Sequence, residues 1–307
     1  MNIVFMGTPE FSVACLQRLI DDGHRVLAVY TQPDKPCGRG HNLTPPPVKV
    51  LAESSGIPVF QPVTLKNEAV VEELRNIGPQ LIIVVAYGKI LPQSVIDLPE
   101  YGCINIHASL LPRYRGAAPI QWCVLNGEKT TGITSMQMDA GLDTGDMLLQ
   151  REIAIGENET SGELHDRLSL LGADVMSDTI NQLEAGTLSP RKQDDSASNY
   201  APMLTKALCR IDWNDSARNI HNKVRGLSPW PVATTVYNGK IIKIHSTEKV
   251  DGAKGKPGEV MENKGRLVVS CGDGLLEIRV LQAEGKKAMP AKDFLAGNKI
   301  ETGEILG

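Results

Sequence analysis

The stretch Leu81-Ile82-Ile83-Val84-Val85 is a run of five apolar residues, of which four are β-branched. A strand that is apolar at every position is typical of a parallel sheet with helices on both faces. Other strand-like stretches lie on either side of it, at residues 2–6, 25–30, 57–60 and 102–106. Helix-like stretches alternate with them, at residues 9–22, 48–55 and 66–76. This alternation predicts an α/β fold with a doubly wound, Rossmann-like and mostly parallel sheet in the N-terminal half.

The pattern changes near residues 186–205, where Gly, Ser, Pro, Asp and Asn accumulate. Beyond this segment, a helix-like stretch at about residues 216–225 is followed by strand-like pieces at residues 233–237, 241–246, 258–261, 266–270 and 275–281. Five short strands in so little chain fit a small β-barrel of OB type. We therefore predict an N-terminal domain over residues 1–185, a linker over 186–205 and a C-terminal domain over 206–307.

A long helix is predicted to begin at Thr160. Thr160 and Glu163 have the spacing of a capping box, in which each residue bonds the backbone N–H of the other. Apolar residues then recur at helical spacing and are predicted to be buried: Leu164, Leu168, Leu171, Val175 and Leu183.

The composition of the 307 residues, 41% hydrophobic and 22% charged, is that of a soluble globular protein. No apolar run approaches the roughly 20 residues that span a bilayer. The N-terminus has no basic leader, so it is interpreted as a first strand and not as a signal peptide. The six cysteines include no Cys-x-x-Cys pair, which argues against a disulfide framework or a structural zinc site. We therefore expect a cytoplasmic protein without a metal.

Charge is distributed unevenly along the chain. The net charge is −4, which taken alone argues against nucleic acid. From Lys206 onward, however, there are 17 basic and 12 acidic residues, whereas residues 1–205 hold 15 basic and 24 acidic residues. A basic C-terminal part indicates contact with a polyanion, although an excess of this size also falls within ordinary surface variation.

The segment of residues 31–49 is rich in Pro and Gly and contains four basic or potentially basic residues, Lys35, Arg39, His41 and Lys49. Loops this long inside a compact sheet domain tend to be either functional or disordered. The segment therefore has two interpretations, a loop that grips phosphate or a mobile surface connection.

Asn105 and His107 lie at the carboxyl end of the strand predicted over residues 102–106. Residues two apart on a strand point to the same face, and open α/β sheets bind ligands at this edge. Asp143, in a Gly-rich turn, is a third candidate. An amide donor, an imidazole and a carboxylate suit acyl transfer to an amine. Each of the three also has a structural interpretation, as a buried histidine, a turn-forming asparagine or a loop aspartate.

Motifs for other chemistries are missing from the sequence. Ser109 is not surrounded by a Gly-x-Ser-x-Gly elbow, so it is not assigned as a nucleophile. The glycine after the first strand does not belong to a Gly-x-Gly-x-x-Gly motif, and no P-loop is present. A dinucleotide or ATP cofactor is therefore not predicted.

Residues 105–119 and 141–146 resemble the folate-dependent formyltransferase family. The resemblance extends to shorter motifs at residues 5–11, 31–34, 47–49, 61–62, 85–88, 211–213, 229–231 and 285–289. It covers nearly the whole chain, and only the last dozen residues match poorly. The combination resembles the members of the family whose acceptor is a charged tRNA.

The resemblance implies 10-formyltetrahydrofolate as formyl donor, the α-amine of methionyl initiator tRNA as acceptor, and Asn105, His107 and Asp143 as the catalytic residues. It also implies folate contacts from Ser109, Leu110, Leu111 and Pro112, and from Tyr87, Gly88, Lys89 and Ile90. The expected tRNA contacts are Lys35, Arg39, His41 and Lys49 in the basic loop, with Arg266, Lys286 and Lys287 in the C-terminal domain. No metal is expected, and nothing in the sequence suggests an obligate dimer, so we expect a monomer.

Three other functions fit part of this evidence. A formyltransferase acting on a small amine would use the same three residues, but it would need neither the basic loop nor a basic C-terminal domain. A formyltetrahydrofolate hydrolase would turn over without any acceptor. A non-catalytic RNA-binding module would have no reason to hold Asn105, His107 and Asp143 around one cavity.

Overall fold

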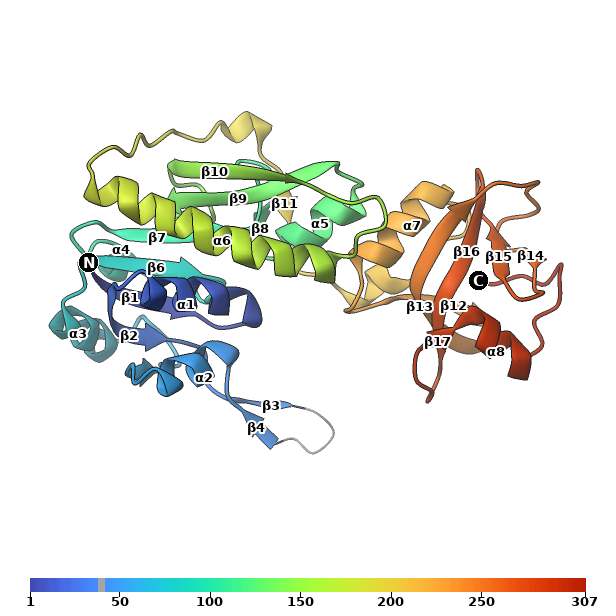
Figure 1. Ribbon diagram of the computed structural model, residues 1–307, viewed down its shortest axis with the longest axis horizontal. Helices are drawn as coiled ribbons and strands as arrows, with labels where there is room; N and C mark the ends of the chain where they lie inside the picture. Colours follow the sequence, from blue (N-terminus) through green and yellow to red (C-terminus); the bar gives the residue numbers. More distant parts are fainter. Residues whose placement is uncertain (38–41) are drawn as a thin grey trace. The chain divides into compact units, whose positions relative to one another are not determined.

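The computed structural model describes residues 1–37 and 42–307, and contacts within the chain divide it into two units (Figure 1). The first unit consists of Met1–Gly116, Thr131–Ile153 and His165–Tyr200. The second consists of Ala117–Thr130, Ala154–Leu164 and Ala201–Gly307. Both units are built from separate stretches of chain, and the domain limits expected at residues 185 and 206 stay a prediction.

The first unit is built around a sheet with the strand order β10-β9-β7-β6-β1-β2-β5 (Figure 1). The bounds of its strands are β1 Asn2–Gly7, β2 Arg25–Tyr30, β5 Val59–Phe60, β6 Leu81–Val85, β7 Cys103–His107, β9 Thr130–Gln137 and β10 Met147–Ala154. The neighbours from β7 to β5 are parallel, whereas β9 pairs antiparallel with β7. The sheet is therefore mixed and mostly parallel, as expected, but β9 and β10 were not predicted.

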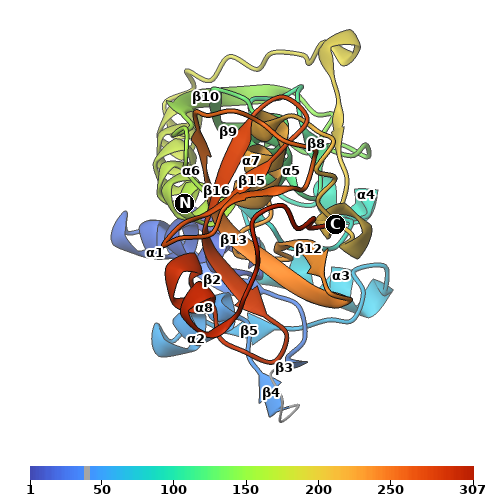
Figure 2. The same cartoon turned by 90° about the vertical axis from the view of Figure 1, so that its right-hand side faces the viewer.

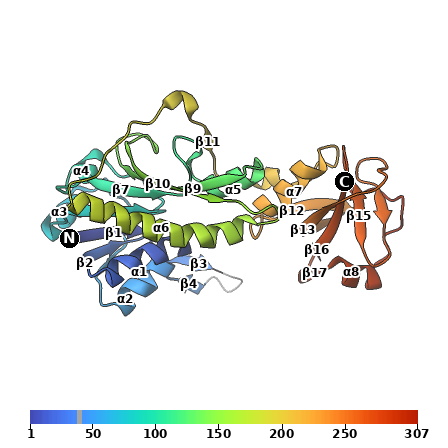
Figure 3. The same cartoon turned by 45° about the horizontal axis from the view of Figure 1, so that its top comes forward.

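Helices cover both faces of this sheet, which explains why its central strands are apolar throughout. Their bounds are η1 Glu10–Ser12, α1 Val13–Asp21, α2 Pro47–Ser54, α3 Glu68–Ile77, α4 Gln93–Ile96 and α6 Ser161–Glu184. A Cβ atom on Gly172 of α6 would lie 3.4 Å from Ile106 of β7 and 3.8 Å from Cys15 of α1, so α1 and α6 share one face. Figure 3 shows α6 lying along the sheet. The other face buries a cluster that includes Val4, Met6, Leu74 and Val95.

The described residues of the basic segment at 31–49 include two short strands that were not predicted. β3 (Lys35–Cys37) pairs antiparallel with β4 (Asn42–Thr44), and α2 then begins at Pro47. Arg39 and His41, two of the expected tRNA contacts, lie outside the described residues.

The second unit contains a curled antiparallel sheet with the order β12-β13-β16-β15-β14, and β17 pairs with β16 (Figure 2). Its strands are β12 Ala233–Tyr237, β13 Lys240–Val250, β14 Val260–Glu262, β15 Leu267–Ser270, β16 Leu275–Ala283 and β17 Met289–Pro290. Asn238 and Gly239 both have positive φ, which the tight turn between β12 and β13 requires. Register shifts around Ser246 interrupt the β13–β16 pairing, and such bulges increase local bend and twist.

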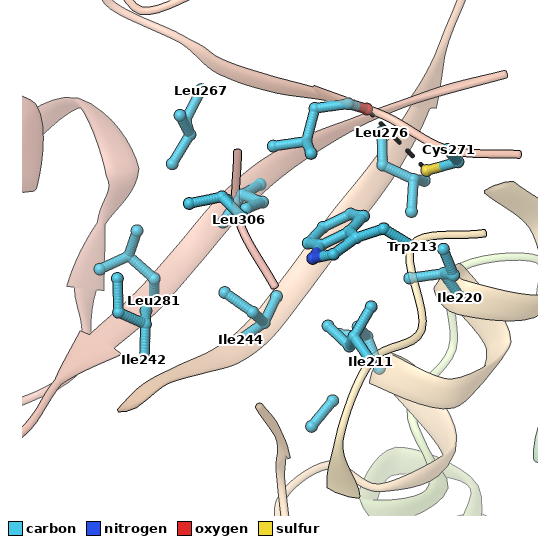
Figure 4. Close-up of a cluster of buried hydrophobic side chains, with 14 of the residues drawn as sticks. Ile211, Trp213, Ile220, Ile242, Ile244, Leu267, Cys271, Leu276, Leu281 and Leu306 are labelled. Atoms are coloured by element: carbon cyan, nitrogen blue, oxygen red, sulfur yellow. Dashed lines mark hydrogen bonds between the residues drawn. The ribbon is translucent and has the colours of Figure 1, made fainter. Parts of the chain in front are cut away.

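The core of this unit surrounds the indole of Trp213, as Figure 4 shows. Trp213 is 4% exposed, and its Nε1 donates to the Oγ1 of Thr235 at 2.9 Å. The helical elements are α5 Pro119–Leu125, η3 Lys206–Cys209, α7 Ala217–Gly226 and α8 Ala291–Gly297. The five predicted strands and the helix at 216–225 are confirmed, so the fold class, Rossmann-like plus a small barrel-like domain, is confirmed as well.

The remaining elements are short and lie between the larger ones: β8 Arg115–Gly116, η2 Asp195–Ala197 and β11 Tyr200–Ala201. Across residues 1–37 and 42–307, no helix is both long enough and apolar enough to cross a membrane.

Candidate active site

Asn105 is the third residue of β7 and His107 is its last, so both lie toward the carboxyl edge of the parallel part of the sheet. Asn105 lies between Val84 of β6 and Met136 of β9 in the register, and His107 pairs with Thr134 of β9. Strand alternation places both side chains on the same face. His107 is 6% exposed, so its imidazole is almost completely removed from water.

Asp143, on the loop between β9 and β10, brings a carboxylate to these two side chains. Its Oδ2 lies 3.7 Å from the Nδ1 of His107, and its Oδ1 accepts from the Nδ2 of Asn105 at 3.5 Å. The backbone N–H of Gly116 donates to Oδ2 at 2.8 Å. The carboxylate side chain is 12% exposed. The three predicted catalytic residues therefore converge on one point, although they lie 38 residues apart in the sequence at the widest.

The second nitrogen of His107 fixes how the ring can act. Its Nε2 lies 2.9 Å from the carbonyl oxygen of Tyr114. Because a carbonyl can only accept, Nε2 carries a hydrogen and donates to it. Nδ1 is then the nitrogen that faces Asp143 and that can gain or lose a proton. When it is protonated, Nδ1 can donate to a negatively charged oxygen beside the carboxylate.

The segment Tyr87–Ile90 differs in exposure from residue to residue. The ring of Tyr87 is 1% exposed within the core, and its carbonyl accepts from the Oγ1 of Thr8 at 3.0 Å. Burial raises the pKa of the Tyr87 hydroxyl to about 12, and among the described residues this hydroxyl has no hydrogen-bond partner. Lys89 donates to the backbone carbonyls of Pro62 and Val63, whereas Ile90 is 82% exposed. The segment therefore offers a ligand its backbone and Ile90 more readily than the Tyr87 ring.

The segment Ser109–Pro112 forms a tight turn directly after β7. The Oγ of Ser109 donates to the carbonyl of Arg113 at 2.6 Å, and the carbonyl of Ser109 accepts from Thr134 at 2.7 Å. Leu111 is buried against Met136 and Met147, while Leu110 and Pro112 are partly exposed. The Ser109 hydroxyl is thus engaged by the backbone.

Two of the expected tRNA contacts in the basic loop take part in contacts within the protein. The Nζ of Lys49 lies 2.9 Å from Asp34 and donates to Gln61 at 2.9 Å. Hydrogen bonds from Gln61 and Lys49 hold the pKa of Asp34 below its ordinary value. Lys35 is exposed and donates to the side chain of Gln32 at 2.7 Å. Lys49 therefore has a structural role in addition to the proposed one.

In the second unit, the three expected contacts also differ. The guanidinium of Arg266 lies 2.6 Å from Glu277 and 3.6 Å from Glu262, so much of its charge is already paired. Lys286 and Lys287 are exposed in the turn between β16 and β17, and no ion pair is recorded for them in the described part of the chain. These two lysines are the better candidates for binding a polyanion.

The sequence did not reveal the backbone groups that complete the site. The carbonyl of Tyr114 and the N–H of Gly116 bind His107 and Asp143, but backbone atoms leave no side-chain signature in a sequence. Within residues 1–37 and 42–307, no group of three or more His, Cys, Asp or Glu side chains is arranged so that it could hold a metal ion.

The sequence is similar to known proteins along its whole length. Residues 1–180 match the formyl transferase family, and residues 203–299 match the formyl transferase C-terminal domain. The methionyl-tRNA formyltransferase of Geobacter metallireducens is 55% identical, with 100% of this chain and 99% of that protein covered. The methionyl-tRNA formyltransferase of Citrifermentans bemidjiense is 52% identical, with 100% and 96% covered.

Among solved structures, similarity is limited to the fold. An N-formyltransferase from Helicobacter canadensis, in complex with folinic acid and dTDP-3-aminofucose, has a TM-score of 0.70 and 20% identity, covering 90% of this chain and 97% of that one. HypX from Aquifex aeolicus in complex with tetrahydrofolic acid has a TM-score of 0.67 and 19% identity, covering 98% of this chain and 50% of that one.

Proposed function

Because this chain belongs to the formyl transferase family, we propose that it transfers the formyl group of 10-formyltetrahydrofolate to the α-amino group of methionyl initiator tRNA. The product is N-formylmethionyl-tRNA, the aminoacyl-tRNA that initiates translation. The observation that carries the proposal is the convergence of Asn105, His107 and Asp143, with the carboxylate 3.5 Å from the amide and 3.7 Å from the imidazole. Full-length identity of 55% to a methionyl-tRNA formyltransferase supports the choice of acceptor.

In the proposed mechanism, the acceptor amine attacks the formyl carbon and the formyl oxygen gains negative charge. The Nδ2 of Asn105 and the protonated Nδ1 of His107 donate hydrogen bonds to that oxygen. Donors that are fixed in position before the reaction stabilise the charge without reorganisation, and removing one donor typically costs about 10²–10³ in rate.

Asp143 is proposed to take the proton that the attacking nitrogen must lose. Its Oδ2 lies 3.7 Å from the Nδ1 of His107, beside the imidazole that would carry positive charge. The folate nitrogen then leaves with a proton that this pair or a water supplies.

The other parts of the proposal concern partners. Exposed Lys286 and Lys287, together with the basic loop, are proposed to bind tRNA phosphates. We also infer a monomer that works in the cytoplasm, where charged initiator tRNA and a reduced folate would both be available.

The test is a formyl-transfer assay with 10-formyltetrahydrofolate and methionyl initiator tRNA, with methionyl elongator tRNA and free amines as alternative acceptors. Fast transfer to the initiator alone supports the proposal. Release of tetrahydrofolate and formate without an acceptor would instead indicate a hydrolase, and transfer to a small amine would indicate a different acceptor class.

Variants of the three residues test the mechanism. His107→Gln and Asp143→Asn should each lower kcat by at least about 10², because each removes a group that acts on the reacting atoms. The KM for tRNA should change little. Asp97→Asn, at an exposed carboxylate that follows α4, is the matched control and should retain full activity. Near-normal turnover in either active-site variant would contradict the assignment.

A further inference from the structure

The segment of residues 191–199, which we call the strap, lies inside the region predicted to be a linker. It is bound to the first unit along its length. The backbone of Arg191 exchanges hydrogen bonds with that of Met147 at 2.8 and 2.9 Å, and its side chain donates to Gln150 at 3.1 Å. Two residues of the strap, Gln193 and Asn199, bind the loops that hold the catalytic side chains.

Gln193 binds the loop that presents Asp143. Its Nε2 donates to the carbonyl oxygens of Asp143 and Gly145, both at 2.8 Å. Its Oε1 accepts from the Nε and Nη2 of Arg115, at 3.0 and 2.8 Å. Both the donor and the acceptor group of the Gln193 amide are therefore engaged. Because the Arg115 guanidinium can only donate, it binds Oε1, and Nε2 faces the loop.

Asn199 binds the turn that presents the partner of His107. Its Oδ1 accepts from the backbone N–H of Tyr114 at 2.5 Å, and its backbone carbonyl accepts from the N–H of Arg115 at 3.0 Å. Tyr114 has a φ of 59°, a backbone conformation that residues other than glycine rarely adopt. Its carbonyl oxygen accepts a hydrogen bond from the Nε2–H of His107. Asn199 therefore holds the peptide units on both sides of Tyr114.

We propose that Gln193 and Asn199 of the strap are positioning residues, which set the Asp143 carboxylate and the His107 imidazole at their working distance. This inference rests on the proposed function. The hydrogen bonds of Gln193 and Asn199 go to the backbone of Asp143, Gly145, Tyr114 and Arg115, and through this backbone they act on the catalytic groups. A displacement of a catalytic group by about 1 Å can cost as much as 10² in rate, so hydrogen bonds of this kind matter for turnover.

The Gln193 side chain acts as a hydrogen-bond donor to the loop, whereas the Asn199 side chain acts as an acceptor. Replacement by a carboxylate should therefore have opposite effects at the two positions. Gln193 must donate, so Gln193→Glu keeps the size and the Arg115 contact but loses both bonds to the loop. Asn199 must accept, so Asn199→Asp keeps the bond to Tyr114, whereas Asn199→Leu removes it. A role limited to folding would lower the melting temperature of these variants but leave kcat of the folded protein unchanged.

The experiment measures kcat, the KM for each substrate and the melting temperature of the full-length protein and its variants. We expect kcat to fall about 10- to 100-fold in Gln193→Glu and Asn199→Leu. Asn199→Asp should stay within about three-fold of the wild type, and no KM should change more than about two-fold. Gln17→Ala, at an exposed glutamine of α1 that bonds Asp21, is a control for changing a surface amide.

Wild-type protein is assayed first, so that the absence of any transfer would count against the proposed function and not against the strap. If the wild type is active and Gln193→Glu folds with unchanged kcat, the positioning role is wrong. Equal losses in Asn199→Asp and Asn199→Leu would also overturn it. Should Gln193→Glu fail to fold, Gln193→Met, neutral and of similar length, takes its place under the same criteria.

Discussion

At the scale of single residues, the backbone around Asp143 is as constrained as its side chain. Asp143 has a φ of 54°, in the left-handed region that L-residues other than Asn and Asp avoid. The loop then closes on β9, where the N–H of Gln137 donates to the carbonyl of Asp146 at 2.9 Å. The carboxylate is thus delivered by a loop that is hydrogen-bonded to β9, and a defined position is what a proton acceptor in the proposed reaction requires.

At Gly145 the loop leaves no room for a side chain. A Cβ atom there would lie 1.7 Å from the carbonyl oxygen of Gln137, a backbone atom that cannot move away cheaply. We expect Gly145→Ala to displace the loop and to lower kcat at least about 10-fold in the formyl-transfer assay. Gly297→Ala in α8, where nothing lies within 4 Å of the added atom, is the matched control. Equal activity of the two variants would mean that the loop position does not limit turnover.

At the scale of elements, α6 shows how local sequence sets a boundary. The N–H of Thr160 donates to Glu163 at 2.8 Å, and the N–H of Glu163 donates to the Oγ1 of Thr160 at 3.2 Å. The predicted capping box is confirmed. Burial of the apolar positions is confirmed for Leu164, Leu168 and Val175, whereas Leu171 and Leu183 are only partly buried. Spacing predicts a face of the helix, but the packing partners decide how much of that face is covered.

Removing the cap should weaken the first turn of α6. Thr160→Ala is expected to cost about 1 kcal/mol, seen as faster amide hydrogen exchange in the first turn of the helix. Thr302→Ala, at an exposed threonine near the C-terminus, should leave that exchange unchanged. Equal exchange rates in wild type and Thr160→Ala would show that packing and not the cap holds this turn.

The same cap predicts a pH dependence. Hydrogen bonds from the backbone and side chain of Thr160 lower the pKa of Glu163 below its ordinary value. A carboxyl whose pKa is lower in the folded chain stabilises the fold above its unfolded pKa of about 4.3, and this contribution is lost as the pH falls through the folded pKa. The effect of Thr160→Ala on hydrogen exchange should therefore shrink in acid, and an effect that grows as the pH falls would contradict this account.

At the scale of the complete chain, the charge that is available to bind a partner depends on which basic residues are already paired. The excess of basic residues lies after Lys206, in the part of the chain that forms the curled antiparallel sheet. Ion pairs with Glu277 and Glu262 occupy Arg266, whereas Lys286 and Lys287 are exposed. Charge counted from a sequence therefore overstates the charge that is free to meet a polyanion.

The salt dependence of tRNA binding should differ between variants of the exposed lysines and variants of the paired Arg266. Replacing Lys286 and Lys287 by glutamate should weaken binding and reduce the slope of log K against log salt by about one unit for each phosphate contact that is lost. Arg266→Gln should have a smaller effect, because its charge is already paired. Arg75→Gln in α3, where Arg75 pairs with Glu72, serves as the control. An unchanged slope in the lysine variants would place the tRNA elsewhere.

Most of the fold could be predicted from the sequence because its signals are local. The apolar run at Leu81–Val85 indicated a parallel strand with both faces covered, and the strands at Arg25–Tyr30 and Ala233–Tyr237 have the predicted bounds. β9 was missed because Thr130–Gln137 is rich in threonine and serine yet mostly buried, as its polar groups are satisfied inside the protein. A pattern of polarity cannot reveal burial that depends on partners elsewhere in the chain.

The alternation of strands and helices, the shared face of Asn105 and His107 and the capping box of α6 were predictable, since each depends on residues a few positions apart. Three other features became visible only in the folded chain. Asp143 reaches this pair, and the carbonyl of Tyr114 receives the Nε2–H of His107. Gln193, from a segment predicted to be a linker, binds the loop of Asp143. The reason is physical: contacts between distant residues, and above all contacts through backbone atoms, depend on how the chain packs, and the types of neighbouring residues do not encode them.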